Sequence, residues 1–130
     1  MVMVQQITKG IKISVKTTYN GTSYRGYNQF HAFSYFVSIE NTTDETVQLL
    51  ERFWEIHDTL NGVEFVEGEG VIGQTPVIGP DEKYNYRSNC FLHGHVGAMK
   101  GKYKMVNTET LEKFFVNIPT FQLITTPSLS

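Results

Sequence analysis

The chain contains 130 residues, and this length fits one domain over residues 1–130 with a single hydrophobic core. The net charge of -2 provides no broad basic field, so we expect neither nucleic acid nor an anionic membrane as the main partner. The single cysteine, Cys90, excludes an intrachain disulfide, and no apolar run reaches the length of a membrane span. We therefore expect a folded protein of the cytoplasm.

Two strands are predicted in the first third of the chain. Ile11, Ile13 and Val15 alternate with polar residues, which is the period of two that is typical of a strand with one buried face. Residues 20–28 are rich in Gly, Asn and Ser, and this composition predicts a loop. Residues 30–41 carry apolar side chains at both odd and even positions, which indicates a strand in the middle of a sheet.

Residues 43–62 carry conflicting local signals. Thr43 or Asp44 is suited to cap a helix, and apolar residues then recur at spacings of three and four until Gly62, which is suited to end one. However, Asn61 and Gly62 together form a strong hairpin signal between two β-prone runs. These residues alone leave helix and strand equally open.

Three further strands are predicted in the second half of the chain. Residues 83–88 alternate cleanly, and residues 99–105 alternate with lysines, which gives one buried face and one face in solvent. In the last strand, residues 114–123, the alternation changes phase around Pro119. Because proline cannot donate to a ladder, we expect a bulge or an edge position there. Short strands separated by turns predict an all-β antiparallel sandwich.

A set of spaced residues runs through the chain in a characteristic order. The set comprises Phe33, Tyr35 and Asn41; Arg52, Trp54, Ile56 and Asp58; Gly68, Gly70, Gly73 and Pro76; Tyr84, Tyr86 and Ser88; Gly97, Met99, Gly101, Tyr103 and Met105; and Ile118, Pro119, Phe121 and Leu123. This pattern resembles the ApaG family (the DUF525 domain) over nearly the whole chain. The resemblance implies a fibronectin type III-like (immunoglobulin-like) antiparallel β-sandwich, and it implies a strand at Trp54.

The resemblance implies little about activity. Bacterial members of the ApaG family are associated with cobalt resistance and magnesium efflux, and related eukaryotic domains occur beside F-box and other partner-binding modules. Neither association implies an enzyme. The chain also departs from the family at Asp81, where the family usually has Gly. Aspartate tolerates a left-handed backbone better than most residues, so we expect the turn there to be kept.

Gly68, Gly70 and Gly73 have the spacing of the dinucleotide-binding fingerprint. That fingerprint directs a helix N-terminus at a pyrophosphate, and no helix is predicted after Gly73. We expect instead that the glycines allow a loop to pass close to neighbouring strands. Such a loop is also able to form an anion cradle of backbone N–H groups, with Arg52 and Arg87 as candidates for the countercharge.

Cys90, His93 and His95 form the metal-like cluster of the sequence. Thiolate and imidazole ligands suit zinc or cobalt, but two of the three positions lie outside the family pattern. Magnesium prefers oxygen ligands, so the cluster does not account for a magnesium association. Cys90 alone is more typical of a small buried residue in a strand.

The sequence therefore predicts a binding domain that is not an enzyme and has no cofactor. We expect it to recognise a protein or a small, phosphate-containing anion through the loop of residues 68–73, as a monomer or a homodimer. The alternative is a role in cobalt or magnesium homeostasis with His93 and His95 as ligands. An enzyme that acts on phosphoanhydrides is the third possibility, since a glycine loop can hold phosphate.

Overall fold

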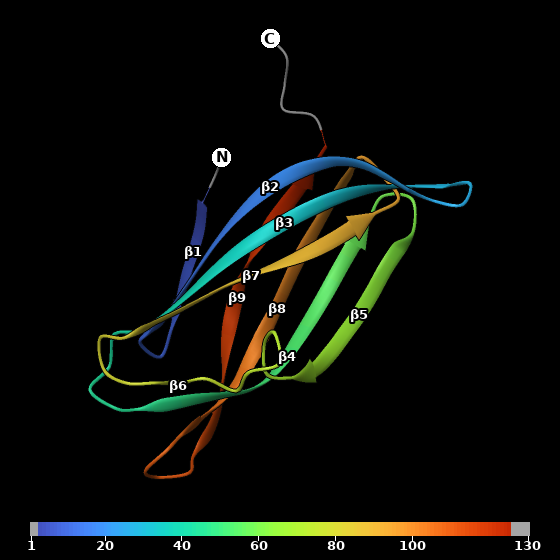
Figure 1. Ribbon diagram of the computed structural model, residues 1–130. Coiled ribbons are helices and arrows are strands. Elements are labelled where there is room, and N and C mark those ends of the chain that lie inside the picture. Colours follow the sequence, from blue (N-terminus) through green and yellow to red (C-terminus); the bar gives the residue numbers. More distant parts are fainter. Residues whose placement is uncertain (1–2, 126–130) are drawn as a thin grey trace.

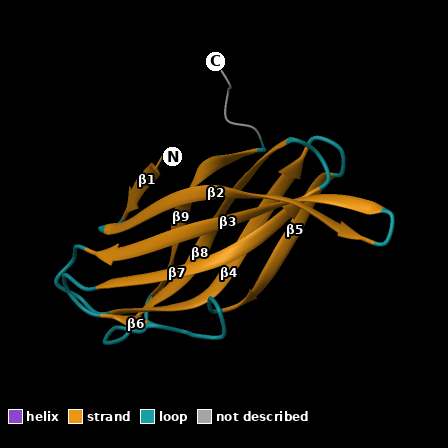
Figure 2. Cartoon of the chain, turned by 45° about the horizontal axis from the view of Figure 1, so that its top comes forward, coloured by secondary structure: helices purple, strands orange, loops and turns teal. Residues whose placement is uncertain are grey.

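The computed structural model describes residues 3–125, and these residues contain strands, turns and loops but no helix. The strands are β1 (Met3–Thr8), β2 (Ile11–Arg25), β3 (Asn28–Asn41), β4 (Val47–Asp58), β5 (Gly62–Glu69), β6 (Val77–Ile78), β7 (Lys83–Leu92), β8 (Val96–Asn107) and β9 (Lys113–Ile124). They form two layers (Figures 1 and 2). A helix long and apolar enough to cross a membrane is therefore absent from this part of the chain.

The two layers are antiparallel sheets. The first sheet has the strand order β1-β2-β3-β7, and the second has the order β5-β4-β8-β9, with β6 also paired to β4. On one side of the sandwich, β1 lies beside β9, and the Asn117 backbone N–H donates to Thr8 Oγ1 at 3.2 Å. On the opposite side β7 and β5 are edge strands, so this side is open. The predicted all-β antiparallel sandwich is confirmed.

The core lies between the sheets and is built from alternating positions of the strands. Ile11, Ile13 and Val15 are fully buried, as their spacing predicts, and they face the second sheet. The Trp54 ring of β4 lies 5.4 Å from the Tyr35 ring and 6.0 Å from the Phe121 ring, between ring centroids. Because aromatic pairs of this kind bury a large area, this cluster fastens the middle of one sheet to the other.

Residues 47–58 form a strand, in agreement with the family resemblance. β4 is paired on both sides, with β5 and with β8, so its backbone groups are satisfied by neighbouring strands. A turn of residues 59–61 leads into β5, where Gly62 has a φ of 81°. The hairpin signal thus describes this segment correctly, because pairing with two strands outweighs a local helical preference.

The prediction of a loop over residues 20–28 is wrong. β2 continues to Arg25 and pairs with β3 up to that residue, so the connection is reduced to a turn at Gly26 and Tyr27. A bulge between Tyr19 and Gly21 interrupts the register, and Gly21 has a φ of 99°. The turn-forming residues therefore supply a bulge and a tight turn within one long hairpin.

The two other predicted irregularities are present. β9 contains one extra residue between Ile118 and Phe121, which places a bulge at Pro119. Asp81 has a φ of 61°, in the left-handed region that glycine would also adopt, and its N–H donates to the Asn41 carbonyl at 2.8 Å. Aspartate therefore keeps the turn between β6 and β7.

We predict that Gly101→Ala destabilises the sandwich. A Cβ at this position would lie 2.1 Å from the Phe53 carbonyl oxygen of the paired strand, so β8 and β4 would have to separate. Overpacking of this kind costs about 1 to 3 kcal/mol, which urea denaturation will measure. Lys102→Arg, which keeps a cation over the Phe53 and Phe115 rings on the solvent face of the same strand, is the control and should change stability by less than about 0.5 kcal/mol. Equal stability of the two variants would contradict the prediction.

Candidate functional site

The glycine-rich segment after β5 forms a second, smaller hairpin, which lies beside β4 on the open side of the sandwich (Figure 1). Val71 and Gln74 exchange backbone hydrogen bonds of 2.8 and 2.9 Å. The two residues between them, Ile72 and Gly73, have φ values of 47° and 71°. Two consecutive left-handed residues are the signature of a type I′ turn. We call residues 70–74 the glycine hairpin.

Each of the three glycines has a distinct steric role. A Cβ on Gly68 would lie 2.9 Å from the guanidinium atoms of Arg52, so the absence of a side chain makes room for that group. A Cβ on Gly70 would lie 2.0 Å from the Gln74 carbonyl oxygen, which closes the hairpin. Gly73 has open space around it and contributes only its left-handed backbone. A close backbone approach is thus present at Gly70 alone of the three, and it occurs within the hairpin itself.

Arg52 connects β4 to the glycine hairpin. Its Nη1 donates to the carbonyl oxygens of Glu69 and Gly70, at 3.0 and 3.1 Å. The pairing register places it on the inner face of the second sheet, beside Gly68 of β5 and Tyr103 of β8. Within residues 3–125, no carboxylate forms a salt bridge with Arg52. Its positive charge is therefore not neutralised by an ion pair within the described chain.

Arg52 and the glycine hairpin line a cavity of about 170 Å³ between the edges of the two sheets. The first sheet contributes the side chains of Tyr35, Tyr86 and Ser88 to the lining. Hydroxyl groups and one guanidinium thus converge on a partly enclosed space.

The tyrosines at this edge also tie the sheets together. The Tyr86 and Tyr103 hydroxyl groups form a hydrogen bond from β7 to β8. Burial raises the pKa values of Tyr35, Tyr86 and Tyr103, and the positive charge of Arg52 acts in the opposite direction on all three. These hydroxyl groups therefore stay protonated at neutral pH, and the bond between Tyr86 and Tyr103 uses one of their protons. The sequence assigned none of Tyr35, Tyr86 and Ser88 to a site, although the alternation of β7 does place the last two on the inner face.

Arg87 does not join this cavity. It lies on the outer face of the first sheet, where its Nη2 donates to Ser34 Oγ at 3.0 Å and its guanidinium lies 5.4 Å from the centre of the Phe36 ring. Consecutive strand residues face opposite sides of a sheet, so Arg87 and Ser88 point away from each other. The structure therefore separates Arg87 from Arg52 and from the glycines.

Cys90, His93 and His95 do not come together as a set of metal ligands. Cys90 is buried in the core, while the His93 ring stacks on Phe30 and the His95 ring stacks on His31, with centroid distances of 4.7 and 4.5 Å. No group of three or more His, Cys, Asp or Glu side chains in the described range is arranged to hold a metal ion. The spacing in sequence was misleading because Cys90 faces the core from within β7, whereas the histidines belong to the loop after it.

Asp58 explains why this loop is ordered in the structure. Its carboxylate accepts backbone N–H bonds from His93 at 2.7 Å, Gly94 at 2.9 Å and Leu60 at 3.0 Å. Burial alone would raise the pKa of Asp58, but these hydrogen bonds outweigh it and lower the pKa. Asp58, one of the residues of the family pattern, is thus a loop cap that joins the β4–β5 turn to the β7–β8 loop.

The fold and the cavity define an antiparallel β-sandwich domain with a clamped glycine hairpin at its open edge. The sequence model of the ApaG domain (DUF525) matches residues 22–107, and the chain belongs to the ApaG family. It is 34% identical over 120 residues to the protein ApaG of Chromohalobacter salexigens, covering 92% of this chain and 94% of that protein. The protein ApaG of Parvibaculum lavamentivorans is 39% identical over 121 residues, covering 93% of this chain and 92% of that protein.

Solved structures also resemble this protein. A Bordetella pertussis crystal structure described as an ApaA protein superimposes with a TM-score of 0.79 and 32% identity, covering 91% of this chain and 95% of that one. An X-ray structure of a structural genomics target gives a TM-score of 0.85 at 36% identity, covering 93% of this chain and 90% of that one. An Archaeoglobus fulgidus protein, at a TM-score of 0.51 and 8% identity, shares the fold alone.

We predict that Gly70→Val disrupts the glycine hairpin. The residue has a φ of 61°, and a side chain would collide with the Gln74 carbonyl, so both backbone strain and steric overlap oppose it. We expect a loss of about 2 kcal/mol or more in thermal or urea denaturation. Gly73→Asn is the matched control, because asparagine tolerates a left-handed backbone and the space there is open. A stable Gly70→Val protein with unchanged amide chemical shifts at residues 70–74 would refute the clash.

We also predict that the Cys90 thiol makes the stability of the protein depend on pH in the alkaline range. Burial, assisted by the negative charges of Glu64 and Asp58, raises the pKa of the Cys90 thiol from 9.0 to about 11. The unfolded chain then releases the thiol proton at a lower pH than the folded chain, so stability is lost as pH rises from about 9 to about 11. The difference between the pKa of the thiol in the folded and in the unfolded chain limits this loss in the free energy of unfolding to about 3 kcal/mol.

Urea denaturation across this pH range, compared between wild type and Cys90→Ala, tests the contribution of the thiol. The variant should be less stable at pH 8 because a buried sulfur is removed, but its stability should fall less steeply above pH 9. Parallel curves for the two proteins would show that the thiol does not contribute to the pH dependence.

Proposed function

We propose that this protein is a binding domain whose cavity at the glycine hairpin receives a small, phosphate-containing anion. The observation that carries the proposal is the position of Arg52, which lines the cavity and forms no salt bridge with a carboxylate of the described residues. Its hydrogen bonds to the Glu69 carbonyl of β5 and to the Gly70 carbonyl of the hairpin are both donated by Nη1. The Nε and Nη2 donors therefore remain available to a ligand.

The donors around Arg52 suit an anion. Ser88 and Tyr35 bring hydroxyl groups to the same cavity, and the raised pKa of Tyr35 keeps its hydroxyl protonated. The backbone N–H groups of Ile72 and Gly73 are not used within the hairpin, since Val71 and Gln74 make its cross-strand bonds. A guanidinium with hydroxyl and backbone donors is a common environment for phosphate oxygens.

The size of the cavity limits the ligand. Pockets for drug-sized ligands have volumes of roughly 300 to 1,000 Å³. The cavity here, at about 170 Å³, is smaller and suits a phosphate or pyrophosphate group better than a whole nucleotide. A larger ligand would have to leave its remaining part outside the edge of the sandwich.

Other features favour binding over catalysis and over a metal-centred role. The Cys90 thiol is buried with a raised pKa, which does not suit a nucleophile. Cys90, His93 and His95 have separate environments, so their placement does not support the cation-homeostasis alternative. We place the protein in the cytoplasm, where phosphate-containing anions are available to it.

We predict that inorganic pyrophosphate binds to the wild-type protein and that Arg52→Gln weakens this binding by about tenfold or more, the effect of losing charge-assisted hydrogen bonds. Isothermal titration calorimetry will measure the affinity. Arg87→Gln changes the net charge equally on the outer face and should leave the affinity unchanged.

Because Arg52 also holds the hairpin, Ser88→Val serves as a second variant that fills the cavity without removing the clamp. It should weaken binding while the melting temperature without ligand stays close to that of wild type. The proposed function would be overturned if pyrophosphate did not bind, or if Arg52→Gln and Arg87→Gln lost affinity for pyrophosphate equally.

A further inference from the structure

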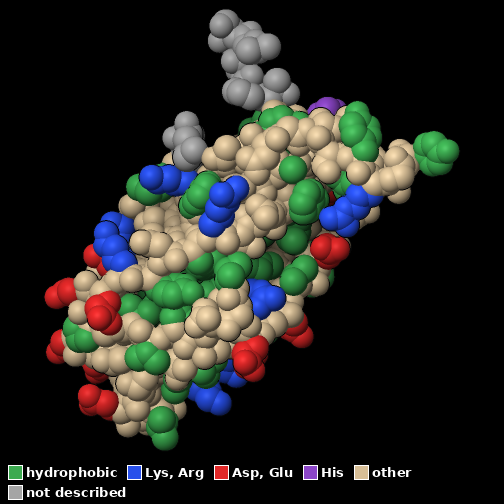
Figure 3. All heavy atoms as spheres, viewed as in Figure 1, with side chains coloured by type: hydrophobic (Ala, Val, Ile, Leu, Met, Phe, Trp, Pro, Cys, Tyr) green, Lys and Arg blue, Asp and Glu red, His purple; other side chains and the backbone are tan. Residues whose placement is uncertain are grey.

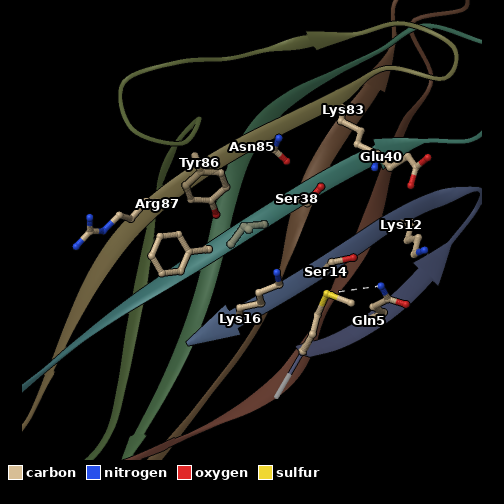
Figure 4. A pocket seen from close by; sticks show the side chains of 13 residues that line it. Gln5, Lys12, Ser14, Lys16, Ser38, Glu40, Lys83, Asn85, Tyr86 and Arg87 are labelled. Carbon is tan, nitrogen blue, oxygen red and sulfur yellow. Dashed lines mark hydrogen bonds between the residues drawn. The ribbon is translucent and has the colours of Figure 1, made fainter. Parts of the chain in front are cut away.

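The outer face of the first sheet carries a trough that crosses its strands. The pairing register sets one row of short, uncharged polar side chains across the sheet, one from each strand: Gln5, Ser14, Ser38 and Asn85. The row on one side contains Lys16, Phe36 and Arg87, and the row on the other contains Lys12, Glu40 and Lys83. Figure 4 shows Ser14 and Ser38 between these longer side chains.

The trough has a volume of about 810 Å³. The serines of the two central strands, Ser14 and Ser38, make its floor, because their side chains are much shorter than those of the flanking rows. This volume lies within the range of ligand-binding pockets. The trough opens on the outer face of the first sheet, whereas the cavity at the glycine hairpin lies on the inner side of β7; Tyr86 is a lining residue of both.

The charges around the trough are unbalanced. Lys12, Lys16, Lys83 and Arg87 line it together with a single carboxylate, Glu40. None of these five residues forms a salt bridge with another described residue. Figure 3 shows the cationic groups standing apart from one another on this face, while acidic groups gather at the end of the molecule near the turns around β6.

The outer face of the second sheet shows a different arrangement. There, Lys100 Nζ lies 3.7 Å from the carboxylate of Glu55, and Lys104 Nζ lies 3.9 Å from that of Glu51. Lys102, which lies between them on β8, is placed over the rings of Phe53 and Phe115 instead. Two of these three lysines of β8 thus have an ion-pair partner, whereas none of the four cations around the trough forms a salt bridge with a described residue, although Glu40 lies between Lys12 and Lys83 in the register.

We propose that this trough binds an acidic, extended peptide segment of a partner protein. Four strands about 4.8 Å apart give the trough a length of about 14 Å, which about four or five extended residues would span. Successive side chains of an extended peptide point to opposite sides, so acidic residues would meet the cations of both flanking rows. The serine and amide groups of the floor would bond to the peptide backbone between them.

An apolar strip in one flanking row gives the peptide a further contact. Phe36 is 38% exposed and Met3 is 47% exposed, and both line the trough beside Lys16 and Arg87. An apolar side chain next to the acidic residues of the peptide would cover Phe36 and Met3. Single-stranded nucleic acid fits this face less well, because its binding depends on several aromatic rings on which successive bases stack.

A titration of the ¹⁵N-labelled protein with a hexaglutamate peptide, which is slightly longer than the roughly four or five residues that span the trough, tests the proposal by NMR. Amide shifts should change for Ser14, Ser38 and Asn85. Lys16→Gln/Lys83→Gln should weaken binding by about tenfold, the effect of losing two exposed ion pairs. Lys100→Gln/Lys102→Gln lowers the net charge by the same amount on the opposite face and should bind as wild type does.

Ser38→Tyr separates a defined site from general attraction, because it fills the floor without changing the charge and tyrosine is favourable in a strand. We expect it to weaken binding as strongly as the double substitution around the trough. The proposal would be overturned if the two double substitutions weakened binding equally, or if the amide shift changes were confined to the glycine hairpin. It would also be overturned if the peptide did not bind. Tighter binding of oligothymidylate with the same variant sensitivity would overturn it in favour of nucleic acid.

Discussion

The Arg52 guanidinium lies against Gly68 and donates to the carbonyl oxygens of Glu69 and Gly70, and this contact determines the shape of the open edge of the sandwich. Hydrogen bonds to a charged group contribute about 1.5 to 3 kcal/mol, more than those between neutral groups. The guanidinium thereby holds the start of the glycine hairpin on β4. It also brings a positive charge to the cavity that the hairpin covers.

The two sides of the sandwich differ because only one of them is closed by neighbouring strands. β1 lies beside β9, whereas β7 and β5 leave a gap into which side chains and the glycine hairpin are packed. On this open side the sheets are joined by the Tyr86–Tyr103 hydroxyl pair instead. A polar connection between sheets leaves donors close to the surface, and this is why the candidate site is found here and not at the β1–β9 side.

β7 contributes to both proposed sites through the alternation of its residues. Ser88 faces inward and lines the cavity, while Arg87 faces outward and lines the trough. A ligand in one site would contact the opposite face of the strand from a ligand in the other. The two sites therefore open on opposite faces of this edge strand, and Tyr86 lines both of them.

Local sequence signals were reliable where a residue type has a single conformational use. The alternation of Ile11, Ile13 and Val15 predicted a buried face, and Pro119 predicted a bulge. Asp81 was expected to take the place of glycine in a turn, and it does. The loop predicted over residues 20–28 was wrong, because turn-forming residues are equally able to form a bulge and a tight turn inside a long hairpin.

The sequence by itself determined the all-β class, the inward phase of most strands and the family, because these depend on periodicity and on the identity of individual residues. Only the tertiary structure decided which residues meet. It placed Arg52 beside Gly68 and sent Arg87 to the opposite face, although both had been assigned to one site. It also separated Cys90 from His93 and His95. Strand pairing sets such neighbours, and the register between distant segments is not written in the spacing of residues along the chain.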